Sequence, residues 1–567
     1  MNLKSLLSLF VLLFAVLATA PEAHAQKNGN KYRPWPAYGF EFKPLKDWAD
    51  SPVDENGKRF GVIGKFEAER GPSLQAENNE RFTYNCSLTV LKIDPQAATT
   101  ESSSDSGGGL RGRVGKEKAA EKTGKDYVGQ LFAGALRKDE YALVEPELET
   151  IKAKGIVGER EIINTFAVFN VGALDVVYDV YTFRLPDYKV MFIWDYPADK
   201  KLRKKWSKAV EKSMKSFRFD LEDAEPSSVR KVNSESAYED LIEYHRTDVE
   251  QTPGWRLVES PSKQYLIKTN SDNKKRITEV IKRLEASRLL FEEDFPPATP
   301  ITSISVVRVC GTEKDFHLYG NTSPGVAGWF NPRSEELVLY FGEGSKESAL
   351  SVVTHEGFHQ YCHFLFNRSA AHRWFDEGHG DYYGAWELKG KRMVPNEDMR
   401  GGLARLPEIK KMIREGTYKP MRRHVRFSHR EWQSQGPSNV SCYAQSFSLI
   451  YFLREGARGK VKKKYWKEEY ADIIPSYIRH LDDGFRTAYE EIKEQAEEEL
   501  QALIDAEAEF ELIETAKKVI ESPWDYLDRY KPEARQEIWA RAMGESWGKI
   551  DEVEFEERWV KYVEDEL

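Results

Sequence analysis

The sequence is poor in cysteine: Cys86, Cys310, Cys362 and Cys442 are the only four in 567 residues, and no two form a Cys-x-x-Cys pair. This sparse spacing excludes the disulfide framework that staples small secreted domains. The four thiols allow three complete pairings, and the sequence does not choose among them.

Basic charge and long apolar runs are also scarce. Lys plus Arg number 84 and Asp plus Glu 93, for a net charge of −9. A mildly acidic chain lacks the basic surface that general nucleic-acid binding needs, so we expect no nucleic-acid partner. No apolar run of spanning length follows the first 25 residues, so we expect no stable membrane insertion of the mature chain. A hydrophobic content of 40% with 12% aromatics excludes a wholly disordered protein.

Residues 1–25 have the pattern of a signal peptide. Lys4 supplies a basic start, Leu6 to Ala20 is almost entirely apolar, and Ala23-His24-Ala25 fits an A-x-A cleavage site. The alternative is a membrane anchor, but the apolar stretch is short and no basic cluster follows it. We therefore expect a mature chain that begins near Gln26 and is secreted or periplasmic.

Residues 26–221 are predicted to form a strand-rich α/β domain. Strand patterns lie at 81–93, 162–170, 175–184 and 190–196, and residues 201–217 have the spacing of an amphipathic helix whose many lysines form a solvated face. This order is similar to the small α/β sandwiches of the Mog1/PsbP type, which often close on a helix and an S-F-R-F-like strand, here 216–219. Residues 222–254 are polar, contain Pro226 and are predicted to be a linker.

The remainder is predicted to be a second domain, at 255–400, followed by a helical part at 401–567. Strands are expected at 265–269, 304–310 and 336–341, with helices at 274–291 and 345–366. Ser345 can cap the second helix. The fold class is therefore α+β.

A metal-binding pattern lies within the helix at 345–366. His355-Glu356-Gly357-Phe358-His359 places two histidines one helical turn apart on one face, which suits a tetrahedral zinc ion. Glu356 would lie beside the open coordination position. A chance match of this kind is expected in roughly 2% of such chains. The uncharged residues that flank the match strengthen it, because they are expected in a helix packed into the domain interior.

The third ligand is assigned through a resemblance. The metzincin pattern is excluded, because Cys362 and Leu365 stand where it requires Gly and His. The segment Trp374-Phe375-Asp376-Glu377-Gly378, with its Glu 18 positions after His359, resembles the W-x-x-E-G signature of the gluzincin zinc peptidases. The resemblance implies that His355, His359 and Glu377 bind zinc and that a water fills the fourth position.

The same resemblance gives Asp381 a supporting role. Thermolysin-like gluzincins have an E-x-x-x-D spacing, and Asp381 follows Glu377 by four residues. Their Asp orients a zinc-binding histidine, which would here be His355. The alternative is a solvent-exposed carboxylate. Cys362, His363, His372 and His379 also lie nearby, and for these we expect a buried thiol and ordinary surface or packing roles.

Three further segments make the resemblance closer to one family than to gluzincins in general. They are 325–340 (GVAGWFNPRSEELVLY), 442–453 (CYAQSFSLIYFL) and 552–563 (EVEFEERWVKYV). Together they are similar to the peptidase-MA-like family of exported bacterial proteins, whose function is poorly defined, over residues 255–567. The implied fold is a thermolysin-like catalytic domain with a mostly helical C-terminal part.

The function implied is hydrolysis of peptide bonds in a peptide or protein substrate. Zinc would activate the water and polarise the carbonyl, and Glu356 would act as general base. Tyr443 is the candidate donor to the oxyanion, with a packed core Tyr as its alternative. Two other functions remain open: a non-catalytic zinc-containing envelope or binding protein, and a zinc hydrolase that acts on a non-peptide bond. The substrate preference and oligomeric state stay open.

Overall fold

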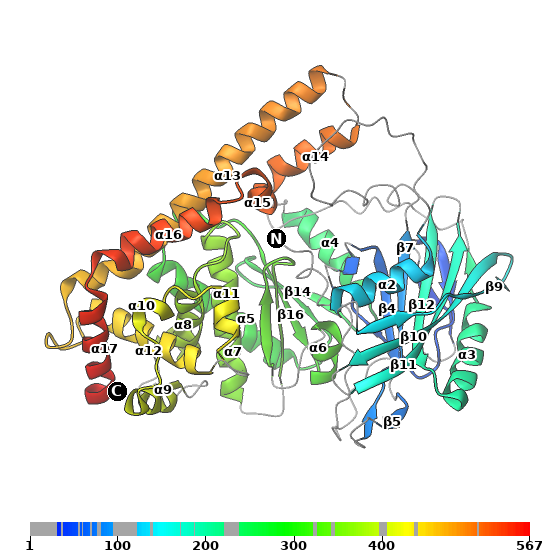
Figure 1. Cartoon of the computed structure of the whole chain (residues 1–567), viewed down its shortest axis with the longest axis horizontal. Coiled ribbons are helices and arrows are strands. Elements are labelled where there is room, and N and C mark those ends of the chain that lie inside the picture. The colour runs from blue at the N-terminus through cyan, green and yellow to red at the C-terminus, as the bar shows by residue number, and fades with distance from the viewer. Residues whose placement is uncertain are drawn as a thin grey trace. The chain divides into compact units, whose positions relative to one another are not determined.

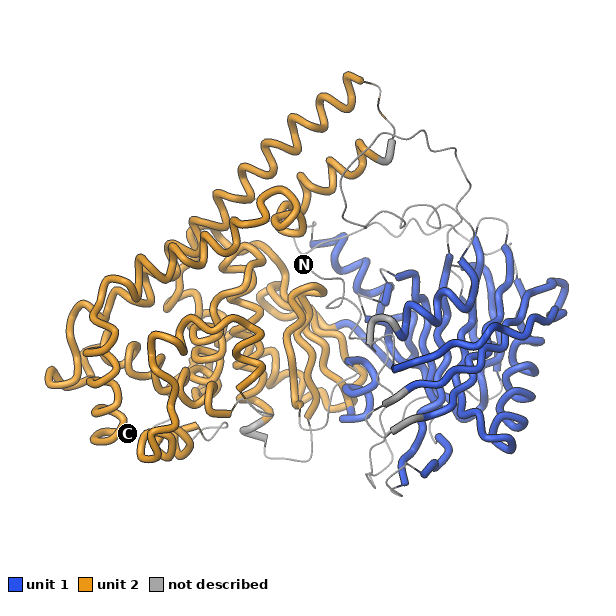
Figure 2. The backbone as a smooth tube through the Cα atoms, in the orientation of Figure 1, with its two compact units in different colours: residues 1–233, 237–257, 312–324 blue, residues 234–236, 258–311, 325–567 orange. Residues whose placement is uncertain are grey.

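The computed structural model describes 31–35, 38–54, 57–58, 60–68, 71–75, 81–93, 122–135, 140–169, 172–185, 188–219, 238–320, 326–341, 346–395, 405–435, 440–506, 508 and 510–567. The chain divides into two compact units (Figure 2). Unit 1 comprises 1–233, 237–257 and 312–324, and unit 2 comprises 234–236, 258–311 and 325–567. Among the described residues, no helix is long and apolar enough to cross a lipid bilayer.

Unit 1 is built on an antiparallel sheet of eight strands in the order β3-β4-β7-β12-β11-β10-β8, with β9 also paired to β10 (Figure 1). These strands are β3 Trp48–Ser51, β4 Val62–Ala68, β7 Ser87–Ile93, β8 Tyr141–Leu143, β9 Glu147–Lys152, β10 Val157–Phe169, β11 Gly172–Arg184 and β12 Lys189–Pro197. Smaller sheets are formed by β1 Arg33–Trp35, β2 Phe40–Phe42 and β13 Arg218–Phe219, and by β5 Ser73–Gln75 and β6 Arg81–Thr83. The helices are α2 Gly124–Ala135, α3 Lys200–Met214, α4 Tyr238–Glu250 and α6 Glu313–Gly320.

Helices α2 and α3 lie on opposite faces of this sheet. Phe132 of α2 packs edge-on against Tyr178 of β11, whereas Ser207 of α3 accepts a hydrogen bond from Arg160, which also binds Asp179. Tyr178 and Asp179 are neighbours in one strand, so their side chains point to opposite faces. Strands β11 and β12 are therefore buried on both sides, which explains why residues 176–183 and 190–197 are almost all buried.

A buried ion cluster fixes α3 to the sheet. Arg160 Nε and Nη2 donate to the two carboxylate oxygens of Asp179 at 2.8 Å each, and Tyr196 donates to Oδ2 at 2.9 Å. Asp179 is completely buried. Burial raises the pKa of its carboxyl, and the hydrogen bonds and charge of Arg160 lower it.

Unit 2 begins with a five-stranded sheet in the order β14-β15-β16-β18-β17. The strands are β14 Arg256–Glu259, β15 Tyr265–Thr269, β16 Ser305–Cys310, β17 Gly328–Asn331 and β18 Glu336–Tyr340. β15, β16 and β18 are parallel, and β17 runs antiparallel to β18 at the end of the order. α5 Lys274–Asp294 and α7 Lys346–Leu365 pack through an apolar cluster on one face, in which Ile281 and Val353 meet Val307.

The rest of unit 2 is helical apart from one hairpin, β19 Trp386–Lys389 and β20 Arg392–Pro395. Its helices are α8 Arg373–Gly384, α9 Arg405–Glu415, α10 Met421–His424, α11 His429–Gln433, α12 Val440–Ala457, η4 Glu468–Asp472, α13 Ile473–Asp505, α14 Phe510–Glu521, η5 Pro523–Tyr526, α15 Leu527–Tyr530, α16 Ala534–Ser546, η6 Trp547–Lys549 and α17 Glu552–Glu566. α8 contacts both α7 and α12. Trp547 and Trp559 are completely buried in the core of this part.

The coarse fold prediction is confirmed: the chain is mixed α and β, rich in sheet towards the N-terminus and helical towards the C-terminus. Several elements differ in detail. Helix α4 lies inside the segment 222–254 that was expected to be a linker, because Leu241, His245 and Val249 form a buried stripe at helical spacing. The strand expected over 81–93 is two strands, β6 and β7. Residues 312–324 group with unit 1 rather than with the domain predicted at 255–400.

The structure describes all four cysteines, but not the predicted signal peptide or the predicted helix cap. All four cysteines are buried free thiols, so none of the three possible pairings forms. The predicted signal peptide at 1–25 and the Ser345 cap lie outside the described residues.

We predict that Asp179→Asn lowers the free energy of unfolding by about 3 kcal/mol, because it removes the only buried carboxylate that Arg160 binds among the described residues and leaves the exposed Glu149 as its counter-charge. Asp199→Asn is the matched control. Asp199 is an exposed cap of α3 that accepts from Lys201 N and Leu202 N, and Asn caps a helix about as well as Asp. Guanidinium unfolding of the two variants measures the difference, and equal unfolding free energies would contradict a structural role for the ion cluster.

Candidate metal centre

Helix α7 carries three of the predicted site residues. Phe358 and Tyr361 are buried in the core of unit 2, and this packing fixes the rotation of the helix about its axis. His355 and His359 then lie one turn apart on the side of α7 that faces α8. Their rings meet edge to face, with centroids 4.7 Å apart.

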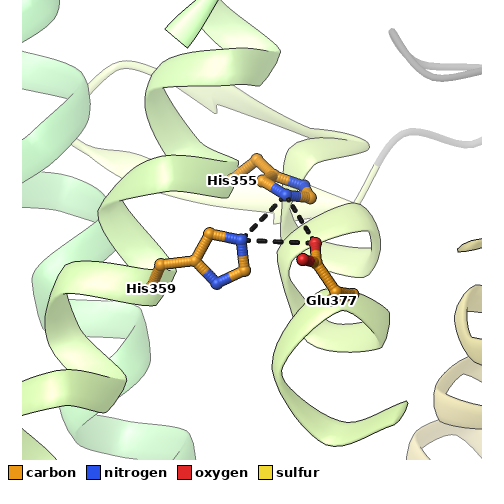
Figure 3. A group of neighbouring side chains, drawn as sticks. All are labelled: His355, His359 and Glu377. Atoms are coloured by element: carbon orange, nitrogen blue, oxygen red, sulfur yellow. Dashed lines mark hydrogen bonds and ion pairs between the residues drawn. The ribbon is translucent and has the colours of Figure 1, made fainter. Parts of the chain in front are cut away.

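Helix α8 brings Glu377 to the two histidines, as Figure 3 shows. His355 Nε2 and His359 Nε2 are 3.0 Å apart, and Glu377 Oε2 lies 3.3 Å from the first and 3.4 Å from the second. Within the described part of the chain, these three residues are the one group of His, Cys, Asp or Glu whose ligand atoms converge closely enough to hold a metal ion.

The geometry fits a tetrahedral ion. Ligand atoms bound to zinc at tetrahedral angles lie about 3.3 to 3.5 Å from one another, close to the spacing found here. Glu377 Oε2 is buried and accepts no hydrogen bond from the described residues. Two imidazole nitrogens and a carboxylate oxygen therefore face one another. A cation placed between them would bind all three.

Each histidine is held from behind by a carboxylate. Asp381 Oδ1 lies 3.1 Å from His355 Nδ1, an ion-pair distance without hydrogen-bond geometry. Asp376 Oδ1 lies 2.7 Å from His359 Nδ1, a contact that sequence reasoning missed. Both contacts use Nδ1, so each ring is held with its Nε2 towards the centre.

Two arginines also belong to the site, and sequence reasoning found neither. Arg405, at the start of α9, donates from Nε to Asp381 Oδ2 at 2.7 Å. Arg373, at the start of α8, donates from Nη1 to Glu377 Oε1 at 2.7 Å. Arg373 lies one turn before Glu377, a spacing visible in the sequence, whereas no local signal connects Arg405 with Asp381.

The close approach of α7 and α8 depends on Gly380. A Cβ atom at this position would lie 2.9 Å from two atoms of the His355 ring. Glycine therefore lets the imidazole lie directly against the backbone of α8. Gly378 has a different neighbour, since a Cβ there would lie 2.7 Å from Ile450 of α12.

The carboxylates of the site favour positive charge on the two histidines. Burial lowers the pKa of His355, but its contacts with Asp381 and Glu377 outweigh burial and raise that pKa to about 10. Burial also lowers the pKa of His359, but Asp376 and Glu377 outweigh burial and raise that pKa well above its usual value. Burial raises the pKa of Glu377, whereas the two histidines hold it well below its usual range.

Glu356 and Tyr443 complete the set of predicted site residues. Burial raises the pKa of the Glu356 carboxyl, while His355 and His359 lower it. Burial also raises the pKa of Tyr443, and so does the negative charge of Glu377. Tyr443 lies on α12, with the Arg405 guanidinium 4.7 Å from its ring centroid. The predicted residues of α7, α8 and α12 are therefore brought to one site.

The four nearby residues, Cys362, His363, His372 and His379, lie outside the converging group of ligand atoms. Cys362 is a buried thiol, and His363 lies 3.2 Å from Glu335. His372 Nδ1 forms a hydrogen bond with the Tyr477 hydroxyl at 2.9 Å, and His379 Nδ1 donates to the Phe375 carbonyl at 2.7 Å. Because that neighbour is an acceptor, His379 carries its proton on Nδ1.

Comparison with known proteins adds no family assignment. No protein-family profile matches the chain, and no curated protein matches it either. Among solved structures, the chain aligns with a crystal structure from Bacteroides thetaiotaomicron VPI-5482 at 9% identity, over 65% of this chain and 85% of that one, with a TM-score of 0.18. A similarity at this TM-score carries no argument about fold or function.

We predict that Gly380→Ala lowers zinc affinity by at least about 10-fold, the scale of losing an outer contact of a metal ligand, because the new methyl group displaces the His355 ring. Gly544→Ala is the control, since a Cβ there meets nothing within 4 Å and α16 tolerates alanine. Gly378→Ala tests specificity, because it should reduce stability without pushing on His355. Competition with a zinc chelator measures affinity, and unchanged affinity in Gly380→Ala would contradict the close packing.

A second prediction separates the two carboxylates behind the histidines. Asp376→Asn and Asp381→Asn should each weaken zinc binding by about 10–100-fold, because each removes the charge that holds an imidazole. Only Asp381→Asn should also lower the unfolding temperature, since it leaves Arg405 without its buried carboxylate partner. Asp472→Asn, at an exposed position, is the control. Wild-type affinity in both site variants would show that the histidines are oriented by other groups.

Proposed function

We propose that this chain is a zinc-dependent peptidase of the gluzincin type, in which His355, His359 and Glu377 hold the metal. The observation that carries the proposal is the convergence of their three ligand atoms at 3.0 to 3.4 Å. Two imidazoles and one carboxylate leave a fourth position open, as in catalytic rather than structural zinc sites. When bound, zinc would supply a Lewis acid that polarises the substrate carbonyl and makes water acidic.

Glu356 would serve as the general base. It follows His355 directly on α7 and is not among the converging ligand atoms, so its carboxylate is left for proton transfer. Burial raises the pKa of this carboxyl, and a general base in this role would accept a proton from water and return it to a leaving amine. A purely structural zinc site has no need of this group, which favours catalysis over a binding protein.

Tyr443 would donate a hydrogen bond to the developing oxyanion. Its raised pKa keeps the phenol protonated at neutral pH, so that it can donate. The Arg405 guanidinium lies against its ring and restricts its position. A donor held in place in this way can stabilise charge in the transition state without reorganising.

The edge strand β17 would receive an extended peptide. Among the described strands, β17 pairs with β18 and stands at the end of the strand order, the position at which an extended peptide adds to a sheet by β-augmentation. A Cβ at Gly328 would lie 3.4 Å from Glu356 Cγ, which places this strand beside the proposed base. The substrate would therefore be a peptide or protein segment in extended form.

The cellular setting is part of the same proposal. The signal-peptide pattern at 1–25 places the mature enzyme outside the cytoplasm, secreted or in the periplasm. Residues 258–311 and 325–400 would form a thermolysin-like catalytic domain, and 401–567 a helical part that supplies Tyr443.

We predict that Glu356→Gln keeps zinc and the fold but lowers peptidase turnover by about 10²-fold or more, the typical scale for a positioned general acid–base. His359→Ala should lose both zinc and activity. The experiment combines elemental analysis with cleavage of casein and a peptide library by the purified mature chain. Glu415→Gln, at an exposed site on α9, is the control and should match the wild type in both measurements.

Each outcome has a distinct meaning. Unchanged zinc in His359→Ala would refute the metal assignment. Equal cleavage rates for Glu356→Gln and the wild type would remove Glu356 from its role. A wild-type chain that holds zinc but cleaves neither casein nor the library would refute the peptidase function and favour a non-catalytic zinc protein or a hydrolase of another bond.

A further inference from the structure

Helix α3 of unit 1 carries a dense row of basic side chains. The helix and its C-cap residue Lys215 together contain seven lysines and one arginine against a single acidic residue, Glu211. All seven lysines, at 200, 201, 204, 205, 208, 212 and 215, are exposed. This local excess contrasts with the chain as a whole, whose net charge is −9.

The lysines lie on one side of the helix. Val210 and Met214 are completely buried and face the sheet, where α3 contacts β11 and β12. Lys201, Lys205, Lys208, Lys212 and Lys215 recur at spacings of four and three residues, so they form a single row along the opposite side. With a rise of 1.5 Å per residue, this row is about 21 Å long.

Most of this charge has no ion-pair partner among the described residues. Lys215 pairs with Glu211, and Arg203 reaches Glu147 at 3.8 Å. Lys201, Lys208 and Lys212 form no ion pair with the described residues. A row of like charges on one helix repels itself, so an external layer of negative charge would stabilise it.

We infer that the α3 lysine row is a docking surface for a lipid bilayer that carries anionic headgroups. The row is straight and fully exposed, and it suits a surface of closely spaced phosphates better than an enclosed small ligand. The apolar face of α3 is committed to the sheet, so the helix has nothing to insert. Binding is therefore peripheral, electrostatic and reversible, unlike that of an amphipathic anchor.

The charge of the rest of the chain sets the conditions for this binding. At a net charge of −9 the whole molecule is repelled by an anionic membrane, and only a local patch can bind. Salt screens charges over about 8 to 10 Å at physiological ionic strength, so lysines in contact with headgroups are screened less than distant acidic groups. Because the lysines are screened less than the acidic groups, the protein would bind with α3 towards the membrane.

The test is sedimentation of the mature chain with vesicles of phosphatidylcholine alone or mixed equally with phosphatidylglycerol. We expect binding to the mixed vesicles only, and its loss at high salt. The triple variant Lys201→Gln, Lys208→Gln, Lys212→Gln should bind about 100-fold more weakly, since each basic residue near an anionic surface contributes a factor of about five. Circular dichroism verifies that the variant is folded.

A matched triple variant has the same change in net charge. Lys389→Gln, Lys411→Gln, Lys561→Gln replaces three exposed lysines of unit 2 and should bind mixed vesicles like the wild type. The inference is overturned if the wild type ignores mixed vesicles or if the two triple variants bind equally. It is also overturned if inorganic polyphosphate binds the row while mixed vesicles do not, because the partner is then a soluble polyanion.

Discussion

The close packing of helix α8 against helix α7 is the constraint on which the candidate metal centre depends. Three ligand atoms from two helices meet within 3.4 Å only because Gly380 lets the His355 ring lie on the α8 backbone. α8 is held from its other side by α12, where Gly378 approaches Ile450 equally closely. The metal geometry is thus a consequence of helix packing on both sides of α8.

Charge balance explains why such a centre is stable enough to form. Glu377, Asp376 and Asp381 bring three carboxylates to the two imidazoles, and Arg373 and Arg405 each neutralise part of that charge from outside. Buried charge is costly unless it is paired. The arginines bind the carboxylate oxygens that point away from the centre, so the oxygens that point towards it keep their negative charge for a cation.

The two units carry different kinds of chemistry. In unit 2, the converging atoms of His355, His359 and Glu377 are positioned by two packed helices, as the proposed metal chemistry would require, because small displacements of a ligand change its function. In unit 1, the basic row of α3 needs only exposure and spacing, since electrostatic attraction to a surface has no exact geometry. The buried pair of Arg160 and Asp179 anchors that helix to the sheet and leaves its lysines in solvent.

Local pattern alone determined much of this protein. The His-Glu-x-x-His spacing places two histidines on one helical face, and the alternation of strands such as 190–196 predicts sheet, because both depend on the period of a single element. The sequence resemblance then selected Glu377, Asp381 and Tyr443, which local periodicity could not do. Tertiary structure decided what lies between elements: Asp376 behind His359 and Arg405 behind Asp381. Those contacts join residues through packing between helices, where sequence distance carries no geometric information.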